Sequence, residues 1–264
     1  AGTLRGNNIP CTIIDANLEG LLFLLDSATE PIETWGRRAY RNIERNLESI
    51  RTPSLYTNLD RYQRAVADLY RILELTGSIN KISLSLANYQ DTSYSPLKSD
   101  DLIQVARQPE DNIFYPYFSK RLGEILAQKQ YRMIGFSLNY LSQAISTFAM
   151  IGYIKQLEPN LPVALGGGLV TSWAKNPGWH NPFTDLVDYV VPGPGENELL
   201  RLLGHKESHT HHAPDFDGLP LSSYLAPGFI LPYAASSGCY WNKCSFCPEK
   251  AEKNPYSAVP TDCV

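Results

Sequence analysis

Residues 133–168 read MIGFSLNYLSQAISTFAMIGYIKQLEPNLPVALGGG, and this pattern predicts a strand, a helix and a second strand in that order. We expect the strands at 133–137 and 162–165, because both are short apolar runs, and the helix at about 141–157. Two strands that are joined by a helix of this length are parallel neighbours in one sheet. The stretch therefore predicts the α/β class of fold.

A third strand and a glycine-rich loop extend the same sheet. The strand is expected at 187–191, and the loop after it, residues 193–196 (GPGE), leads into a leucine-rich helix at 199–203. In open parallel sheets a ligand binds outside the carboxyl ends of the strands. Glycine lets the backbone approach such a ligand closely, because no Cβ intervenes. The candidate contacts at the strand ends are Ser137, Asn139, Gly166, Gly167, Gly168, Gly193, Gly195 and Glu196.

Glu196 has a second interpretation. It begins the predicted helix, and a carboxylate in the first turn of a helix is favoured without any ligand. The glycines at 166–168 likewise have a simpler reading as a tight turn. The convergence of several such residues on one edge of the sheet is what favours a binding site.

The segment before this sheet is mostly helical in pattern. Residues 1–6 look like the end of a helix and residues 10–15 like a short strand, so we expect an α/β domain whose first strand is missing from the chain. From about residue 18 to residue 130, apolar side chains recur at helical spacing. This pattern predicts a long helical insertion, which would serve as a lid or as packing.

Composition limits the classes of protein that the chain can belong to. Hydrophobic residues make up 43% and charged residues 19%, as in a soluble globular protein. The formal net charge of −4 disfavours nucleic-acid binding that depends on attraction to phosphate. Residues 133–154 carry no formal charge but hold several hydroxyl and amide side chains, which are costly in lipid, so we expect no membrane span. An odd number of cysteines suits a reducing cytoplasm.

Three cysteines gather in residues 238–249, GCYWNKCSFCPE. Thiolates are soft ligands, so Cys239, Cys244 and Cys247 favour zinc or an iron–sulfur cluster. A closed structural zinc site takes four ligands, whereas three thiolates on a four-iron cluster leave one iron open to a small molecule. Two further interpretations stay open: a zinc knuckle that borrows a ligand from elsewhere, and three unrelated thiols.

The same stretch resembles the cluster loop of radical S-adenosylmethionine (SAM) enzymes. In that family three cysteines hold a 4Fe–4S cluster, SAM chelates the fourth iron, and an electron from the cluster cleaves SAM to a 5′-deoxyadenosyl radical. The resemblance implies that Cys239, Cys244 and Cys247 are the cluster ligands and that Phe246 packs near the adenine of SAM. The spacing here is CxxxxCxxC, where the family pattern is CxxxCxxC. The loop accommodates the extra residue if residues 240–243 bulge outward.

The strand ends carry a second resemblance, to cobalamin-binding domains. Half of the cobalamin signature is a Ser-x-Leu triplet followed by a pair of glycines, after a gap similar to that between Asn139 and Gly166 here. Ser137-Leu138-Asn139 with the glycines at 166–168 matches it, except that Asn139 stands where leucine is usual. The resemblance implies that these residues accommodate the nucleotide tail of cobalamin. The other half of the signature, with the histidine that binds cobalt, would follow the missing first strand.

Together these features are similar to the cobalamin-binding radical SAM enzymes over essentially the whole chain. The resemblance implies a Rossmann-like cobalamin-binding domain at 1–203, with the insertion at about 18–130, and a linker at 204–228. Residues 229–264 would then start a radical SAM (βα) barrel, with its first strand at 229–235. Such a barrel needs many more residues than follow the cysteines. We therefore expect a fragment that is inactive alone.

The implied activity is that of a cytoplasmic enzyme that uses the cluster, SAM and cobalamin. Its commonest reaction in the family is methyl transfer to an unactivated carbon. The implied electron donor is a low-potential flavodoxin or ferredoxin, and the sequence does not identify the substrate, whether a small molecule or a peptide. Two interpretations without catalysis stay open: a corrinoid-binding carrier or sensor, and an interaction protein with a zinc knuckle.

Overall fold

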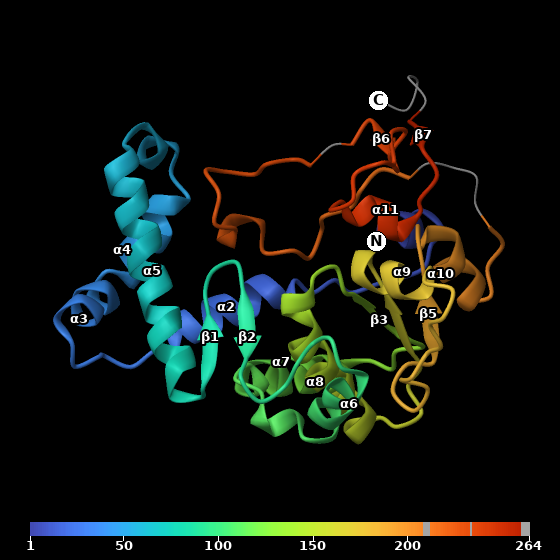
Figure 1. The fold of residues 1–264 in the computed structure, drawn as a ribbon, viewed down its shortest axis with the longest axis horizontal. Helices are drawn as coiled ribbons and strands as arrows, with labels where there is room; N and C mark the ends of the chain where they lie inside the picture. Colours follow the sequence, from blue (N-terminus) through green and yellow to red (C-terminus); the bar gives the residue numbers. More distant parts are fainter. Residues whose placement is uncertain (208–211, 233, 260–264) are drawn as a thin grey trace.

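The computed structural model describes residues 1–207, 212–232 and 234–259, and its architecture is mixed α/β. In Figure 1 the helices within residues 34–79 (blue to cyan) project at one end, and a small sheet lies toward the other. The C-terminal segment (orange and red) runs along one side of both (Figure 1). Among the described residues, no helix is long and apolar enough to cross a membrane.

The parallel sheet agrees with the sequence prediction. Strands β3 (Ile134–Ser137), β4 (Val163–Gly166) and β5 (Tyr189–Val191) pair in the order β3-β4-β5. Ser137 stands opposite Gly166, and Gly166 stands opposite Val191. The carboxyl ends of the three strands therefore lie level along one edge of the sheet. This edge positions the loops that were predicted to bind a ligand.

Helix α8 (Leu141–Leu157) connects β3 to β4 and forms the centre of the core. Phe148 on this helix is fully shielded from solvent, as expected of a helix that is apolar on all sides. At Gly152 the helix lies so close to α6 (Ser99–Arg107) that an added Cβ would overlap the carbonyl of Ala106. The uncharged stretch of the sequence, residues 133–154, therefore consists of strand β3, a short loop and most of an interior helix.

The helices expected between residues 18 and 130 are present, with one addition. An antiparallel hairpin of β1 (Ile82–Leu84) and β2 (Tyr89–Asp91), which the sequence analysis does not predict, lies among them and is part of the same core. The helical elements of this half of the chain, including the short 3-10 helices, are α1 (Gly2–Gly6), α2 (Ala16–Asp26), α3 (Thr34–Arg41), α4 (Ile43–Ile50), η1 (Pro53–Thr57), α5 (Leu59–Ile79), α6, η2 (Pro109–Asp111) and α7 (Tyr115–Gln128).

The prediction of a strand at residues 10–15 is wrong. These residues belong to no sheet, and Asp15 instead caps helix α2, where its Oδ1 accepts a hydrogen bond from the N–H of Leu18 at 3.0 Å. The other carboxylate oxygen accepts a hydrogen bond from the hydroxyl of Tyr224 at 2.6 Å. The prediction failed because Pro10 has no N–H for a strand ladder and because an aspartate side chain competes for the backbone as a helix cap.

The strand expected at residues 229–235 does not form in the described part of this segment. Residues 229–232 belong to no sheet, and residue 233 lies outside the described ranges. Phe229 is 54% exposed, because no described strand lies beside it. The elements that follow β4 and β5 are α9 (Gly168–Ala174), α10 (Glu196–Leu202), η3 (Leu221–Ser223), β6 (Ser236–Ser237), α11 (Pro248–Glu252) and β7 (Ser257–Ala258), with β6 and β7 antiparallel.

The polar segment expected as a linker, residues 204–228, is held against the N-terminal half of the chain. Residues 208–211 of this segment lie outside the described ranges. Arg5 forms an ion pair with Asp215 at 2.7 Å, and the guanidinium of Arg51 donates a hydrogen bond at 2.9 Å to a backbone carbonyl of the same segment. The described part of the segment is therefore anchored by specific side chains.

Candidate functional site

The first part of the site is the loop after β3, which Asn139 connects to the loop after β4. The side-chain amide of Asn139 donates a hydrogen bond to Ser137 Oγ at 3.2 Å, and its Oδ1 accepts one from the N–H of Gly168 at 3.0 Å. Ser137 and Asn139 are exposed, whereas Leu138 between them is buried. The triplet therefore alternates between the core and the surface, and its two polar side chains lie at the strand ends.

Gly167 is required by the backbone at this edge. Its φ of 101° and ψ of 173° belong to a conformation that is essentially restricted to glycine. An added Cβ would stand 2.5 Å from the carbonyl oxygen of Leu138. The flanking Gly166 has a similar constraint, since a Cβ there would lie 2.9 Å from the carbonyl oxygen of Val191. The glycines thus let the loops of neighbouring strands approach one another.

The loop after β5 reaches the same edge. Gly193, with a φ of 74°, donates its N–H to the hydroxyl of Thr171 at 2.9 Å. Gly195 is the N-cap residue of α10, and Glu196 is the exposed first residue of that helix. Its position in the first turn is electrostatically favourable in itself. All eight predicted residues therefore lie at the carboxyl ends of the three strands, in the loops after them or at the first residue of the helix that follows. Glu196 needs no ligand to explain its position.

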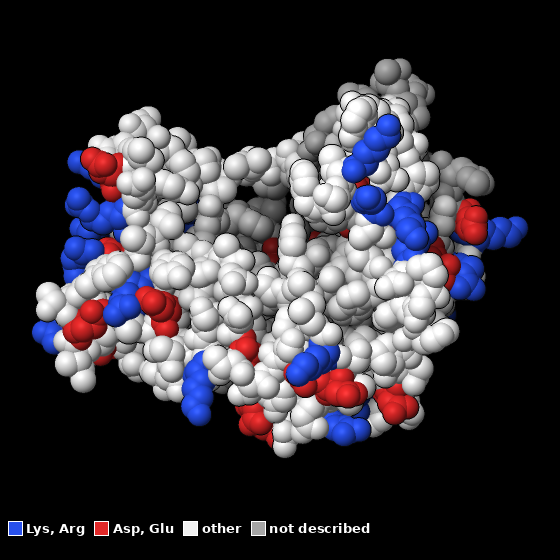
Figure 2. Space-filling view, in the orientation of Figure 1, with Lys and Arg blue, Asp and Glu red and all other residues white. Residues whose placement is uncertain are grey.

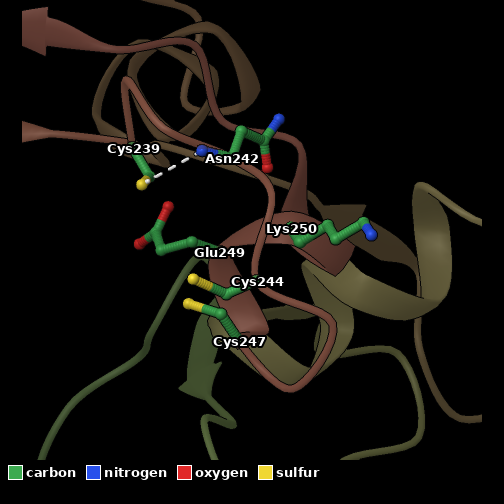
Figure 3. A pocket seen from close by; sticks show the side chains of 6 residues that line it. All are labelled: Cys239, Asn242, Cys244, Cys247, Glu249 and Lys250. Atoms are coloured by element: carbon green, nitrogen blue, oxygen red, sulfur yellow. Dashed lines mark hydrogen bonds between the residues drawn. The ribbon is translucent and has the colours of Figure 1, made fainter.

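The second part of the site is the cysteine loop. Cys239, Cys244 and Cys247 line one small pocket, together with Glu249 and others (Figure 3). The N–H of Asn242 donates a hydrogen bond to Cys239 Sγ at 3.4 Å. N–H donors of this kind tune a metal site when the sulfur is a ligand.

The extra residue of the CxxxxCxxC spacing is accommodated by a left-handed turn. Asn242 has a φ of 44°, a conformation that asparagine tolerates better than most residues. Tyr240 and Trp241 are 81% and 56% exposed, so this part of the loop bulges toward solvent as expected. The longer spacing therefore leaves all three cysteines facing the same pocket.

Glu249 is a member of this pocket that the sequence analysis does not name. Figure 3 shows its carboxylate between the sulfur of Cys239 and those of Cys244 and Cys247. Its Oε2 atom is buried and has no hydrogen-bond partner among the described residues. The only sequence signal is its place two residues after the last cysteine, which does not by itself determine where the side chain points.

The pocket's donor chemistry is compatible with an iron–sulfur cluster. Cys239, Cys244 and Cys247 are free, partly exposed thiols. Within the described ranges, no three His, Cys, Asp or Glu side chains stand close enough together to hold a single ion. Thiolates are soft ligands that suit either zinc or an iron–sulfur cluster.

The two parts of the site are adjacent. Helix α11, which begins directly after Cys247, packs against α9 at the carboxyl edge of the sheet, as Figure 1 shows. A Cβ on Gly168 would lie 2.8 Å from Glu252 Oε1. Lys253 Nζ donates a hydrogen bond at 3.3 Å to the carbonyl oxygen of Lys175, which follows α9. The sequence predicts each part separately, and the structure places them side by side.

Phe246 stands in the turn between Cys244 and Cys247, and its ring is 88% exposed. An exposed phenyl ring at this position is free to pack against a flat partner, and its contact with the adenine of SAM stays a prediction.

No family model, curated protein or solved structure matches this chain. Its function is therefore argued from the residues and their geometry.

Proposed function

We propose that Cys239, Cys244 and Cys247 hold a 4Fe–4S cluster and that the chain belongs to a cobalamin-dependent radical SAM enzyme. The observation that carries the proposal is the meeting of two predicted sites, because the cysteine pocket adjoins the carboxyl edge of a parallel sheet. When bound, the cluster would supply the electron that cleaves SAM, and the cobalamin would supply a methyl group for an unactivated carbon.

In this proposal the protein's own residues hold the cofactors, orient them and shield them from solvent. The three thiolates would bind three irons, and the N–H of Asn242 would stabilise charge on Cys239 Sγ. The exposed ring of Phe246 would cover the adenine of SAM. Two observations support these roles: the three cysteines and Asn242 line one pocket, and the ring of Phe246 is exposed in the turn between Cys244 and Cys247.

The strand-end loops would bind cobalamin. Ser137 offers an exposed hydroxyl, and the glycines at 166–168 and 193 expose backbone without a Cβ. Asn139 is held by its own hydrogen bonds to Ser137 and Gly168, so it would position the loops. In this proposal residues 1–203 form a Rossmann-like domain and residues 229–264 begin a (βα) barrel.

Exposed lysines surround the cysteine loop and suit an acidic electron donor. Lys243 and Lys250 belong to the loop and to α11, and Lys253 and Lys175 lie beside them. Figure 2 shows basic side chains over α11 and the adjoining loop. A flavodoxin or ferredoxin with a negative surface would be attracted there at low ionic strength. A cytoplasmic location and a reducing environment follow from the proposed cluster.

The test is electron paramagnetic resonance (EPR) on anaerobically reconstituted, dithionite-reduced protein, with and without SAM. We expect a signal of a reduced four-iron cluster that changes shape when SAM is added, and loss of the signal in Cys244→Ala. A cluster that is indifferent to SAM, in a protein that binds cobalamin, would favour the carrier or sensor. One equivalent of zinc without iron would favour the zinc knuckle and refute the proposal.

A further inference from the structure

The carboxylate of Glu249 faces the cysteine pocket without a partner for one of its oxygens. Glu249 is the second residue of α11, and its side chain lines the pocket together with the three cysteines. Its Oε2 is buried, and no described residue donates a hydrogen bond to it. A buried carboxylate oxygen without a partner is costly, so a group that completes it is expected at this position.

The neighbouring side chains do not supply that partner. In Figure 3 the ammonium group of Lys250 points away from the sulfur atoms, and so does the side chain of Asn242. The N–H of Asn242 already donates to Cys239 Sγ. The carboxylate is instead directed to the space that the three sulfurs border (Figure 3).

We propose that Glu249 is a fourth protein ligand of the metal group in this pocket, and that a carboxylate oxygen binds the iron that the three cysteines leave open. The inference rests on the proposed function, because it needs a cluster on Cys239, Cys244 and Cys247. Carboxylate oxygen is an established ligand for first-row metals beside nitrogen and sulfur donors. The bond is a coordination bond in which the carboxylate donates an electron pair and no atom is oxidised or reduced.

This ligand would close the site until SAM arrives. SAM would take the open iron by displacing the Glu249 oxygen, so one iron–oxygen bond breaks as the bonds to SAM form. The carboxylate would thereby protect the cluster from water and from stray thiols at rest. Glu249 thus regulates access to the site, and its loss would leave an iron exposed to solvent.

The experiment detects the carboxyl carbon of Glu249 near the cluster directly. The full chain is made by cell-free synthesis with glutamate labelled by ¹³C at the side-chain carboxyl group, reconstituted anaerobically and reduced with dithionite. Electron–nuclear double resonance then measures the ¹³C coupling to the cluster spin, first without and then with SAM. The same measurement is made on Glu249→Ala, on Glu249→Gln and on the control Glu252→Ala.

Glu252 is a matched control because it is a glutamate on the same short helix whose carboxylate has another partner. Its Oε2 accepts a hydrogen bond from the amide of Asn254 at 2.9 Å. Its side chain lies at Gly168 and does not line the cysteine pocket. Loss of this carboxylate should leave the ¹³C coupling unchanged.

We expect a ¹³C coupling in the parent chain and in Glu252→Ala, its loss in both Glu249 variants, and its loss from the parent when SAM is added. A cluster signal without any ¹³C coupling in the parent would overturn the inference and leave the proposed function intact. A coupling that appears only with SAM would also overturn it and would make Glu249 a contact of SAM. Absence of a cluster signal in every sample would instead refute the proposed function. The result in the parent chain decides the question even if Glu249→Ala fails to fold.

Discussion

Replacement of Gly167 by alanine should destabilise the strand-end loops more than the same change at Gly193 or at Gly178. Two costs coincide at this residue. Its φ and ψ of 101° and 173° lie in a region where a non-glycine residue costs about 1–3 kcal/mol. The new Cβ would also stand 2.5 Å from the carbonyl oxygen of Leu138, and overpacking of this kind costs about 1–3 kcal/mol.

The sum predicts a loss of about 2–6 kcal/mol in the free energy of unfolding for Gly167→Ala. Gly193→Ala separates the two costs, because Gly193 also has a positive φ, of 74°, but the nearest atom to a new Cβ is a side-chain oxygen 3.8 Å away. It should lose only about 1–2 kcal/mol. Gly178→Ala, with no atom within 4 Å of the new Cβ, is the neutral reference.

The assay is equilibrium unfolding in urea, followed by circular dichroism, on the parent and the three variants. The expected order of stability is Gly178→Ala, then Gly193→Ala, then Gly167→Ala. The reasoning is refuted if Gly167→Ala is no less stable than Gly193→Ala. In that case the loops after β3 and β4 would not approach each other as closely as the structure shows. Cobalamin binding by the same variants would show whether the loop geometry also matters for the proposed ligand.

Further predictions concern the cysteine loop, its surroundings and the sheet. Cys244→Ser should lose most of the bound iron and acid-labile sulfide, and unchanged iron content would contradict the assignment of the ligands. In the double variant Lys243→Glu/Lys250→Glu, reduction of the cluster by flavodoxin should be slower than in the parent at low ionic strength. At high salt, where charges are screened, the two rates should be equal. Stopped-flow absorbance measures both rates, and equal rates at low salt would show that these lysines do not contribute to docking. Burial alone would raise the pKa of Asp188, but hydrogen bonds from Lys155 Nζ and from a backbone N–H outweigh it and lower the pKa. A lowered carboxyl pKa gives stability that is complete above the ordinary value of about 3.9 and is lost as the pH falls through the lowered value. Asp188→Asn should therefore be less stable than the parent at pH 7, by about 1 kcal/mol for this partly exposed pair. The difference in the free energy of unfolding, measured by urea titration, should become smaller below about pH 4. A difference that does not change with pH would refute the ion-pair account.

The sequence predicts the core of the sheet well because each element there depends on its own residues. Helix α8 occupies the predicted range, 141–157, since it is apolar on all sides and is preceded and followed by clear breaks. The strands β3 and β4 are short apolar runs on either side of it. Hydrophobic pattern alone therefore decides this part of the fold.

The errors arise where a distant partner decides the structure. Residues 10–15 have the apolar side chains of a short strand, but no described strand pairs with them, and Asp15 serves as a helix cap. Residues 229–232 have the apolar composition of a strand and likewise lack a neighbour. A strand requires another strand to bond with, so local sequence cannot establish that it forms.

In the candidate site, too, some residues can be predicted from the sequence and one cannot. The three cysteines and the strand-end glycines are visible in the sequence, because their residue types and spacing carry the chemistry. Glu249 is not, because its direction depends on how the loop turns at Asn242 and on where α11 rests. The direction of the Glu249 side chain toward the cysteine pocket is a property of the folded chain. It can be seen only once the positions of the loop and of α11 are known.

If the proposed function holds, helix α11 would make assembly of this protein depend on the order in which its cofactors are added. It rests on α9 over the edge where a corrinoid would enter, and it is joined directly to Cys247. A bulky cofactor that entered at the strand ends would have to displace α11, and Cys247 would then move with the helix. Binding at the strand ends would thereby change the geometry of the cysteine loop. The sequence in which iron, sulfide and cobalamin are added during reconstitution should decide how much of the protein matures.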